Sequence, residues 1–252
     1  MKITLFYNKS VHENAAYYYD LSKETREKIK GLEKAISETE NEIKNLKKEE
    51  KEVKIKRNRE WFEKFHHSLT TDGKLMIGGR NAQQNDFIVS KHMEDNDLFF
   101  HADIQGGTVV VLKDGLNASD EVLLEAAQFA ACFSNAWKNA NAAVDVYCVK
   151  KDQLTKNISG GFVPSGAFAI LGERKWFRST RLMLRIGLED KQLRIISDVS
   201  KTQLKNQLKV VPSLTAKDKG ALAKSLSKRF LVHVDEILEL LPNGKTKTVE
   251  IS

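Results

Sequence analysis

The sequence contains few cysteines and no long apolar run. Its two cysteines, Cys132 and Cys148, lie in apolar patterns, which argues against a disulfide framework and gives no CxxC redox or zinc motif. No apolar stretch is long enough to span a bilayer, and the N-terminus does not have the pattern of a signal peptide. We therefore expect a cytoplasmic protein with reduced, buried thiols, no membrane partner, and no metal or cofactor.

Proline and glycine are also scarce in the first quarter of the chain. From about Val11 to Phe65 there is no proline and only one glycine, Gly31. Within this Lys- and Glu-rich stretch, aliphatic residues recur at alternating spacings of three and four, which predicts a coiled-coil face. This partner seam comprises Ile29, Leu32, Ile36, Ile43, Leu46 and Val53. The alternative is a single charged helix that Glu–Lys pairs four residues apart stabilise.

The patterning divides the chain at about residue 60. Residues 1–60 are expected to form a short strand at 3–6 and the long helix, and residues 61–252 an α/β or α+β domain. From about residue 213 onward we expect a helical C-terminal extension, with Thr215 as a helix cap. Further strands are expected at 74–78, 97–102, 108–113, 143–150, 167–171 and 182–188, and helices at 82–93, 119–137 and 234–241. The strands at 167–171 and 182–188 are expected to pair around a basic connection.

Residues Ile77–Asn85 form an unusual segment, in which a strand runs into Gly78-Gly79 and then into an amide-rich helix start. Backbone N–H groups at a helix start can bind an anion, and Arg80 could add a bidentate phosphate contact. The other interpretation is a tight turn whose amides cap the helix. The segment matches neither a Walker loop nor a dinucleotide-binding fingerprint. The residue types leave both interpretations open.

His101 and Asp103 lie one residue apart at the end of a predicted strand, beside Gly106-Gly107. Such a pair could support acid–base chemistry or metal binding, and hence a metal-dependent hydrolysis of RNA. However, no activated nucleophile and no third ligand accompany the pair at a familiar spacing. A histidine and a carboxylate that fix a turn are the structural alternative, and we expect a protein that is not an enzyme.

A net charge of +7 favours polyanionic partners, and the charge alone does not separate nucleic acid from membrane surface. Ten lysines and arginines lie between Gly172 and Lys209, with Trp176 and Phe177 interleaved. Arginine beside aromatic residues suits phosphate contacts combined with base stacking, so this segment favours RNA. The alternative is a solvated face with Trp176 packed inward.

Several of these blocks together resemble one family. Trp61–Phe65, Asp72-Gly73, Ile77–Asn85 and His101–Asp103 resemble the NFACT-R domain, the RNA-binding half of the NFACT proteins of ribosome-associated quality control. Further resemblances to the same family are Pro164–Phe168 with Gly172, and Asn14-Ala15 with Tyr17–Tyr19 at the start of its second coiled-coil helix. The sequence departs from the usual family pattern at Asn81, His67 and Gln105.

The resemblance implies a protein that binds tRNA and the large ribosomal subunit, assists rescue of stalled ribosomes and supports C-terminal tailing of the nascent chain. The peptide chemistry would belong to the ribosome. The family's N-terminal domain, helix-hairpin-helix part and first coiled-coil helix have no counterpart here, which implies that the seam pairs with a separate N-terminal half or with a second copy of the chain. The RNA-binding candidates are Arg80, Gln83, Gln84, Asn85, His101, Asp103, Arg174, Lys175, Trp176, Arg178 and Arg181.

Overall fold

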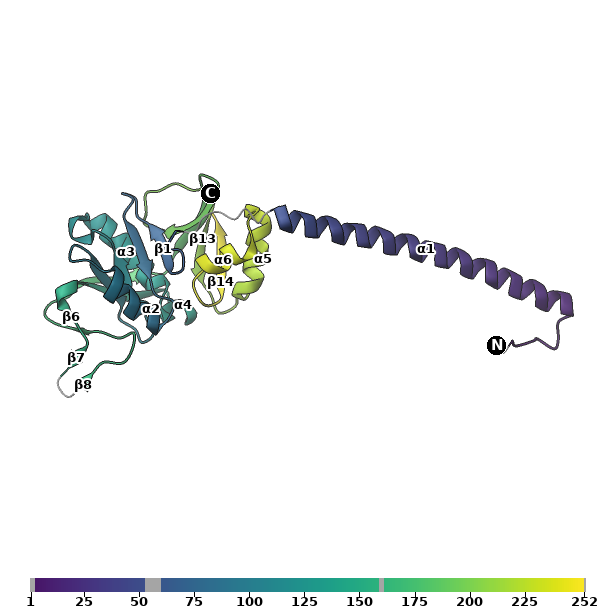
Figure 1. Ribbon diagram of the computed structural model, residues 1–252, viewed down its shortest axis with the longest axis horizontal. Coiled ribbons are helices and arrows are strands. Elements are labelled where there is room, and N and C mark those ends of the chain that lie inside the picture. Colours follow the sequence, from purple (N-terminus) through teal and green to yellow (C-terminus); the bar gives the residue numbers. More distant parts are fainter. Residues whose placement is uncertain (1–2, 53–59, 159–160, 252) are drawn as a thin grey trace. The chain divides into compact units, whose positions relative to one another are not determined.

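The computed structural model describes residues 3–52, 60–158 and 161–251. The chain forms two units, residues 1–56 and residues 57–252 (Figure 1). Within the described parts of the chain, no helix combines the length and apolar character that crossing a membrane requires. Cys132 and Cys148 are both buried and unbonded, as expected, and burial raises the pKa of the Cys148 thiol to about 11.

The first unit consists of helix α1 (Val11–Glu52) and an N-terminal segment that folds onto its first turns. The expected strand at residues 3–6 is wrong. The side-chain oxygen of Asn14 accepts from the backbone N–H of Phe6 at 2.9 Å, and its amide donates to the Phe6 carbonyl at 3.1 Å. The Tyr18 hydroxyl donates to the carbonyl of Thr4. Side chains of the helix thus bind backbone groups that a strand would give to a neighbouring strand.

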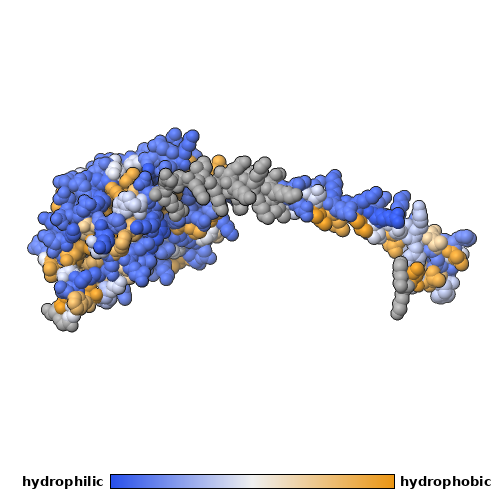
Figure 2. Space-filling view, in the orientation of Figure 1, coloured by the Kyte–Doolittle hydropathy of each residue, from blue (hydrophilic) through white to orange (hydrophobic). Residues whose placement is uncertain are grey.

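The described side chains of the partner seam are solvent-exposed on α1. Ile29, Leu32 and Ile36 are 49%, 64% and 59% exposed, although large aliphatic residues are ordinarily buried. Figure 2 shows hydrophobic residues along one side of this helix. The helix continues through Ile43 and Leu46, but their side chains, like all of Val53, lie outside the described residues. Ile29, Leu32 and Ile36 therefore form an apolar face that the described residues of the first unit do not cover.

The second unit is an α+β domain that is built on a six-stranded antiparallel sheet with the order β1-β2-β4-β3-β5-β10. Side chains on adjacent positions of a strand point to opposite faces, so the sheet supports two cores. On one face Phe100 packs with helix α3, and on the other Phe99 packs with Ile88. The elements are β1 (His66–Leu69), β2 (Leu75–Gly78), α2 (Ala82–Phe87), a π-helical turn (Ile88–His92), β3 (Leu98–Ala102), β4 (Val110–Leu112), α3 (Asp120–Cys132), β5 (Ala143–Lys150) and β10 (Lys175–Arg181).

A second sheet has four antiparallel strands in the order β12-β11-β13-β14. Its buried residues share one core with α3 and with helices α5 and α6, which lie side by side next to β14 (Figure 1). The chain therefore does not end in a purely helical extension, because its last strand completes this sheet. These elements are β11 (Leu184–Glu189), β12 (Gln192–Ser197), β13 (Lys205–Pro212), α5 (Lys219–Phe230), α6 (Val234–Leu240) and β14 (Thr246–Glu250).

Short elements lie between the strands of the six-stranded sheet along the chain. Helix α4 (Asn135–Lys138) follows α3, because Ser134 caps a new helix and interrupts the single helix that was expected to reach Trp137. Beyond β5 lie two short hairpins. The remaining short elements are two 3-10 turns (Gly115–Asn117 and Lys151–Gln153), β6 (Leu154–Thr155), β7 (Asn157–Ile158), β8 (Gly161–Phe162) and β9 (Ala169–Ile170).

The pairing expected around the basic connection is wrong. Strand β9 pairs with β6, whereas the connection itself is the strand β10 and pairs with β5. β10 can occupy the edge of the sheet because its lysine and arginine side chains remain exposed there. The cap of α5 also differs from the expectation, since Asp218 rather than Thr215 precedes the helix.

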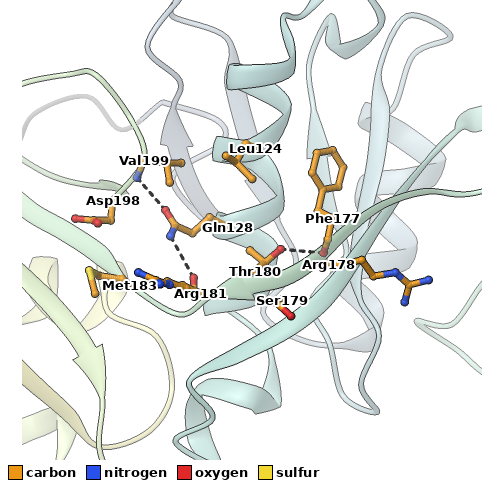
Figure 3. Close-up of a pocket in the computed structure, with 10 residues that line it drawn as sticks. All are labelled: Leu124, Gln128, Phe177, Arg178, Ser179, Thr180, Arg181, Met183, Asp198 and Val199. Carbon is orange, nitrogen blue, oxygen red and sulfur yellow. Dashed lines mark hydrogen bonds between the residues drawn. The ribbon is translucent and has the colours of Figure 1, made fainter.

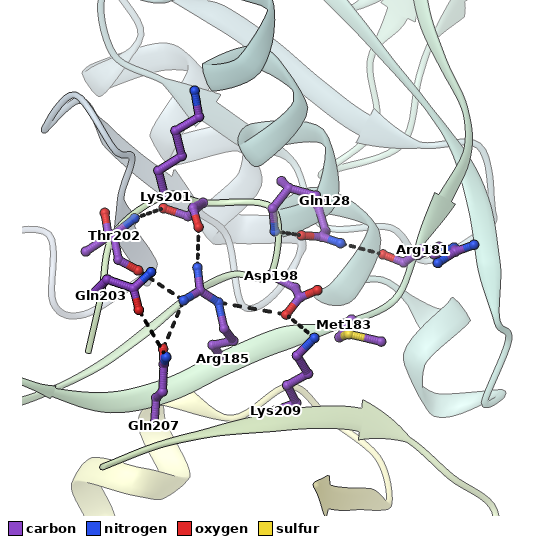
Figure 4. A network of polar contacts seen from close by, with 12 residues as sticks. Gln128, Arg181, Met183, Arg185, Asp198, Lys201, Thr202, Gln203, Gln207 and Lys209 are labelled. Atoms are coloured by element: carbon purple, nitrogen blue, oxygen red, sulfur yellow. Dashed lines mark hydrogen bonds and ion pairs between the residues drawn. The ribbon is translucent and has the colours of Figure 1, made fainter. Parts of the chain in front are cut away.

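Arg185 is a buried cation that ties the second sheet to the loop after β12. Its guanidinium donates to the carbonyl of Thr202 at 3.0 Å, to the side-chain oxygen of Gln207 at 2.9 Å and to the carbonyl of Ser200. An ion pair with Asp198 at 3.8 Å completes the network (Figure 4). One side chain therefore satisfies several groups that would otherwise be buried without partners.

We predict that Arg185→Met destabilises the domain by about 3 kcal/mol, because the substitution leaves the carbonyls of Ser200 and Thr202 without their donor and removes one of the two cations beside Asp198. Arg229→Met is the matched control, since Arg229 makes an exposed ion pair with Glu250 and its loss should change stability little. Urea unfolding gives the free energy of unfolding of both variants, and equal values would refute the anchoring role of Arg185.

Candidate nucleic-acid interface

The glycine-rich segment after β2 forms a turn and a helix cap. The side chain of Asn81 accepts from the backbone N–H of Gln84 at 2.9 Å, and the Gln84 side chain accepts from the N–H of Arg80 at 2.9 Å. The Arg80 guanidinium donates to the carbonyls of Lys64 and Phe65, both at 3.1 Å. These contacts favour the turn-and-cap interpretation over an anion site. Gln83 lies exposed on α2.

Asn85 and Gly166 hold two segments of the domain together, Ile77–Asn85 and Pro164–Phe168. The Asn85 side chain is buried, accepts from the N–H of Val109 at 3.4 Å and donates to the carbonyl of Gly166 at 3.4 Å. Gly166 has φ +78°, and a Cβ there would lie 2.5 Å from the Cα of Ala82. The Pro164–Phe168 block therefore docks closely on the start of α2, which requires glycine at this contact.

Gly166→Ala should destabilise the domain by about 2 kcal/mol, because the added methyl group meets Ala82 and the backbone is left-handed. Gly220→Ala is the control, since a Cβ at Gly220 has no neighbour within 4 Å. Thermal unfolding of both variants tests the prediction. An unchanged melting temperature for Gly166→Ala would show that the two blocks do not need this close contact.

His101 and Asp103 lie in different surroundings at the end of β3. The His101 ring lies between Phe99 and Tyr147, with centroid distances of 6.3 and 5.8 Å, and burial lowers its pKa. Asp103 lies beyond the end of β3 with an exposed side chain, while its backbone N–H donates to the carbonyl of Asp145 at 2.7 Å. Among the described residues, no cluster of histidine, cysteine and carboxylate side chains could hold a metal ion.

Three adjacent strands place aromatic side chains in a row across one face of the six-stranded sheet. His101 of β3 and Trp176 of β10 both lie opposite Tyr147 of β5 in register. The Tyr147 and Trp176 rings meet edge to face at a centroid distance of 5.4 Å. We call these three residues the aromatic row. Tyr147 was not among the candidates, because nothing in the alternation of its strand distinguishes it from a core residue.

Two arginines cover the row from the solvent side. The guanidinium of Arg174 lies 4.7 Å from the Tyr147 ring centroid and 5.8 Å from that of Trp176. The guanidinium of Arg178 lies 4.1 Å from the Trp176 centroid. Both arginines are exposed, and stacking on a ring leaves the edge of a guanidinium able to donate hydrogen bonds. Tyr147 is buried, and His101 and Trp176 are half-buried, with Trp176 packed against the core that contains Tyr147. The row is therefore the outer layer of a core, with an exposed cationic cover.

Asp145 fixes the second of these arginines. Its carboxylate pairs with Arg178 at 2.6 Å and accepts from the backbone N–H of Ser179 at 2.8 Å, and these two contacts lower its pKa. Ser179 has φ +50° at an irregularity in the β5–β10 pairing. This β-bulge changes the direction of side chains along β10.

The remaining candidates of the basic segment do not join the row. The Nζ atom of Lys175 lies 5.8 Å from the ring centroid of Phe177 and forms an ion pair with the Asp120 carboxylate at 2.6 Å. Arg181 lines a pocket together with Phe177. Farther along, Arg185 is buried, and Arg194, Lys201 and Lys209 pair with carboxylates. The segment is thus not one uniform basic patch, and its cations are distributed over different surroundings.

Residues 61–172 match the family described as the NFACT protein RNA binding domain. The chain is 37% identical over 205 residues to the archaeal Rqc2 homolog aRqcH of Methanocaldococcus jannaschii, covering 78% of this chain and 30% of that protein. It is 33% identical to the ribosome quality control complex subunit NEMF homolog of Drosophila melanogaster, and the match covers 71% of this chain and 19% of that protein. The ribosome quality control complex subunit NEMF of Homo sapiens is also 33% identical, and the match covers 69% of this chain and 17% of that protein. The chain thus spans less than a third of the length of these curated relatives.

Proposed function

Because the chain belongs to the NFACT family, we propose that residues 61–252 form an RNA-binding domain that acts in ribosome-associated quality control, on tRNA and on RNA of the large ribosomal subunit. The observation that carries the proposal is the aromatic row with Arg174 and Arg178 stacked over it. The protein would act by binding, in the cytoplasm, and would assist rescue of stalled ribosomes and tailing of the nascent chain rather than catalyse a reaction itself.

The chemistry of the row suits RNA. Arginine guanidinium groups that stack on rings keep donors for phosphate oxygens, and the half-buried rings of His101 and Trp176 can receive unstacked bases. In the proposed interface Arg174 and Arg178 bind phosphate and Trp176 supports a base. His101 is the third member of the row, and Asp103 lies next to it beyond the end of β3.

The candidates near α2 have a different proposed part in the interface. Arg80, Gln84 and Asn85 hold the turn and the Pro164–Phe168 block, so we propose that they position the surface. Gln83 is the exposed member of the group and could contact RNA directly.

Replacing Arg174 and Arg178 together by alanine should weaken tRNA binding and lower the slope of log affinity against log salt by about 1 to 2, since each lost phosphate contact lowers it by roughly 0.7 to 0.9. The control is Lys224→Ala with Lys228→Ala, which removes the same charge from helix α5. Fluorescence anisotropy at several salt concentrations measures the tRNA affinity and its salt slope for both double variants. A slope equal to that of the unaltered protein would exclude the two arginines from the interface.

We also propose that α1 pairs with another helix through the partner seam. The exposure of Ile29, Leu32 and Ile36 supports this, because burying three aliphatic side chains would favour association by several kcal/mol in total. The partner would be a separate N-terminal half of the factor, in accordance with the longer relatives, or a second copy of this chain.

Ile36→Glu should abolish association through the seam, because it places a charge on the apolar face. Ser37→Glu adds the same charge at the neighbouring position outside the seam and serves as the control. Sedimentation velocity of the lone chain detects a second copy, and co-purification from its own cells detects a separate half. The proposed seam is wrong if Ile36→Glu and Ser37→Glu associate as well as the unaltered chain.

A further inference from the structure

A pocket of 460 Å³ lies beside β10, between that strand, helix α3 and residues 198–199 (Figure 3). Leu124, Phe177, Met183 and Val199 give it apolar walls. The Phe177 ring is fixed from behind by Phe100, at a centroid distance of 5.9 Å. The volume lies within the usual range for small-molecule sites, and one aromatic wall suits a flat ligand.

The polar groups around the pocket fix its shape, and two arginines, Arg178 and Arg181, are among the residues that line it. The Gln128 amide donates to the carbonyl of Arg181 at 3.1 Å, and its oxygen accepts from the N–H of Val199 at 3.0 Å, which joins opposite walls. Asp198 is held by Lys209 at 3.4 Å and by Arg185 (Figure 4). The exposed Arg181 has no carboxylate within ion-pair distance among the residues that the structure describes.

We propose that this pocket receives one unstacked nucleobase of single-stranded RNA and that Arg181 binds the adjoining phosphate. The inference rests on the proposed RNA-binding function and adds a base site to it. β10 is the edge strand of its sheet, and Arg178 and Arg181 lie three residues apart on it. One RNA strand that crosses this edge can therefore contact the aromatic row with one nucleotide and the pocket with another.

Charge and shape together favour a nucleotide over an uncharged ligand. An apolar cavity alone would accept many ligands, but an arginine without a carboxylate partner at its wall favours one that carries an anion. A base that stacks on Phe177 and a phosphate at Arg181 satisfy both features with a single nucleotide unit.

The test compares two single strands of about twelve nucleotides, an oligouridine RNA and an abasic ribose-phosphate strand of equal length. Leu124→Trp fills the pocket from α3, and Val199→Trp fills it from the opposite wall. Leu116→Trp is the matched control, because Leu116 is 43% exposed, as Leu124 is 41%, and does not line the pocket. Arg181→Ala removes the proposed phosphate contact.

Both pocket-filling variants should weaken binding of oligouridine about tenfold and leave the abasic strand unaffected, whereas Leu116→Trp should bind as the unaltered protein does. Arg181→Ala should weaken both strands. The base site is refuted if the filling variants bind oligouridine normally, or if they lose affinity equally for both strands. If the unaltered protein binds neither of the two strands and does not bind tRNA, the proposed function itself is refuted instead.

Discussion

The pairing of β10 with β5 is the interaction on which the proposed interface depends. It extends the sheet by one strand and sets Trp176 opposite Tyr147, so that His101, two strands away, completes the aromatic row. The same strand turns Phe177 to the other face, where it packs with Phe100. Without this pairing, the arginines of the segment would lie in a loop and would have no platform beneath them.

The turn after β2 has a supporting rather than a contacting part in this arrangement. Arg80 and Gln84 donate to backbone groups of the segment before β1, and Asn85 bonds with Gly166. The Pro164–Phe168 block is thereby held against α2, and Phe168 contacts Phe99 at a centroid distance of 5.7 Å. Motif residues that look suited to phosphate thus build the side of the sheet on which the row lies.

Local pattern predicted the elements whose own residues determine them. The strand at Ala143–Lys150 and the start of a helix at about residue 119 were confirmed, since alternation and capping are local signals. The sequence did not predict β10 as a strand, because basic residues at its exposed positions hide the alternation. Residues 3–6 looked like a strand but bind the side chains of α1, which no local pattern reveals.

Only part of the candidate site could be predicted, because the sequence shows composition and local pattern but not which strands pair. Arg174, Trp176 and Arg178 stood out through composition, whereas Tyr147 joins them only through strand register. Composition also could not distinguish exposed cations from Arg185, which is buried in a hydrogen-bonded network. Which arginines are exposed and which serve the fold is decided by the tertiary structure.

The most direct test of the account is ultraviolet crosslinking of the protein to bound RNA, with the crosslinked residues identified by mass spectrometry. The account predicts crosslinks at Tyr147, Trp176 and Phe177, on the two faces of the β5–β10 pair. Crosslinks confined to helices α5 and α6, with none on β5 or β10, would contradict it.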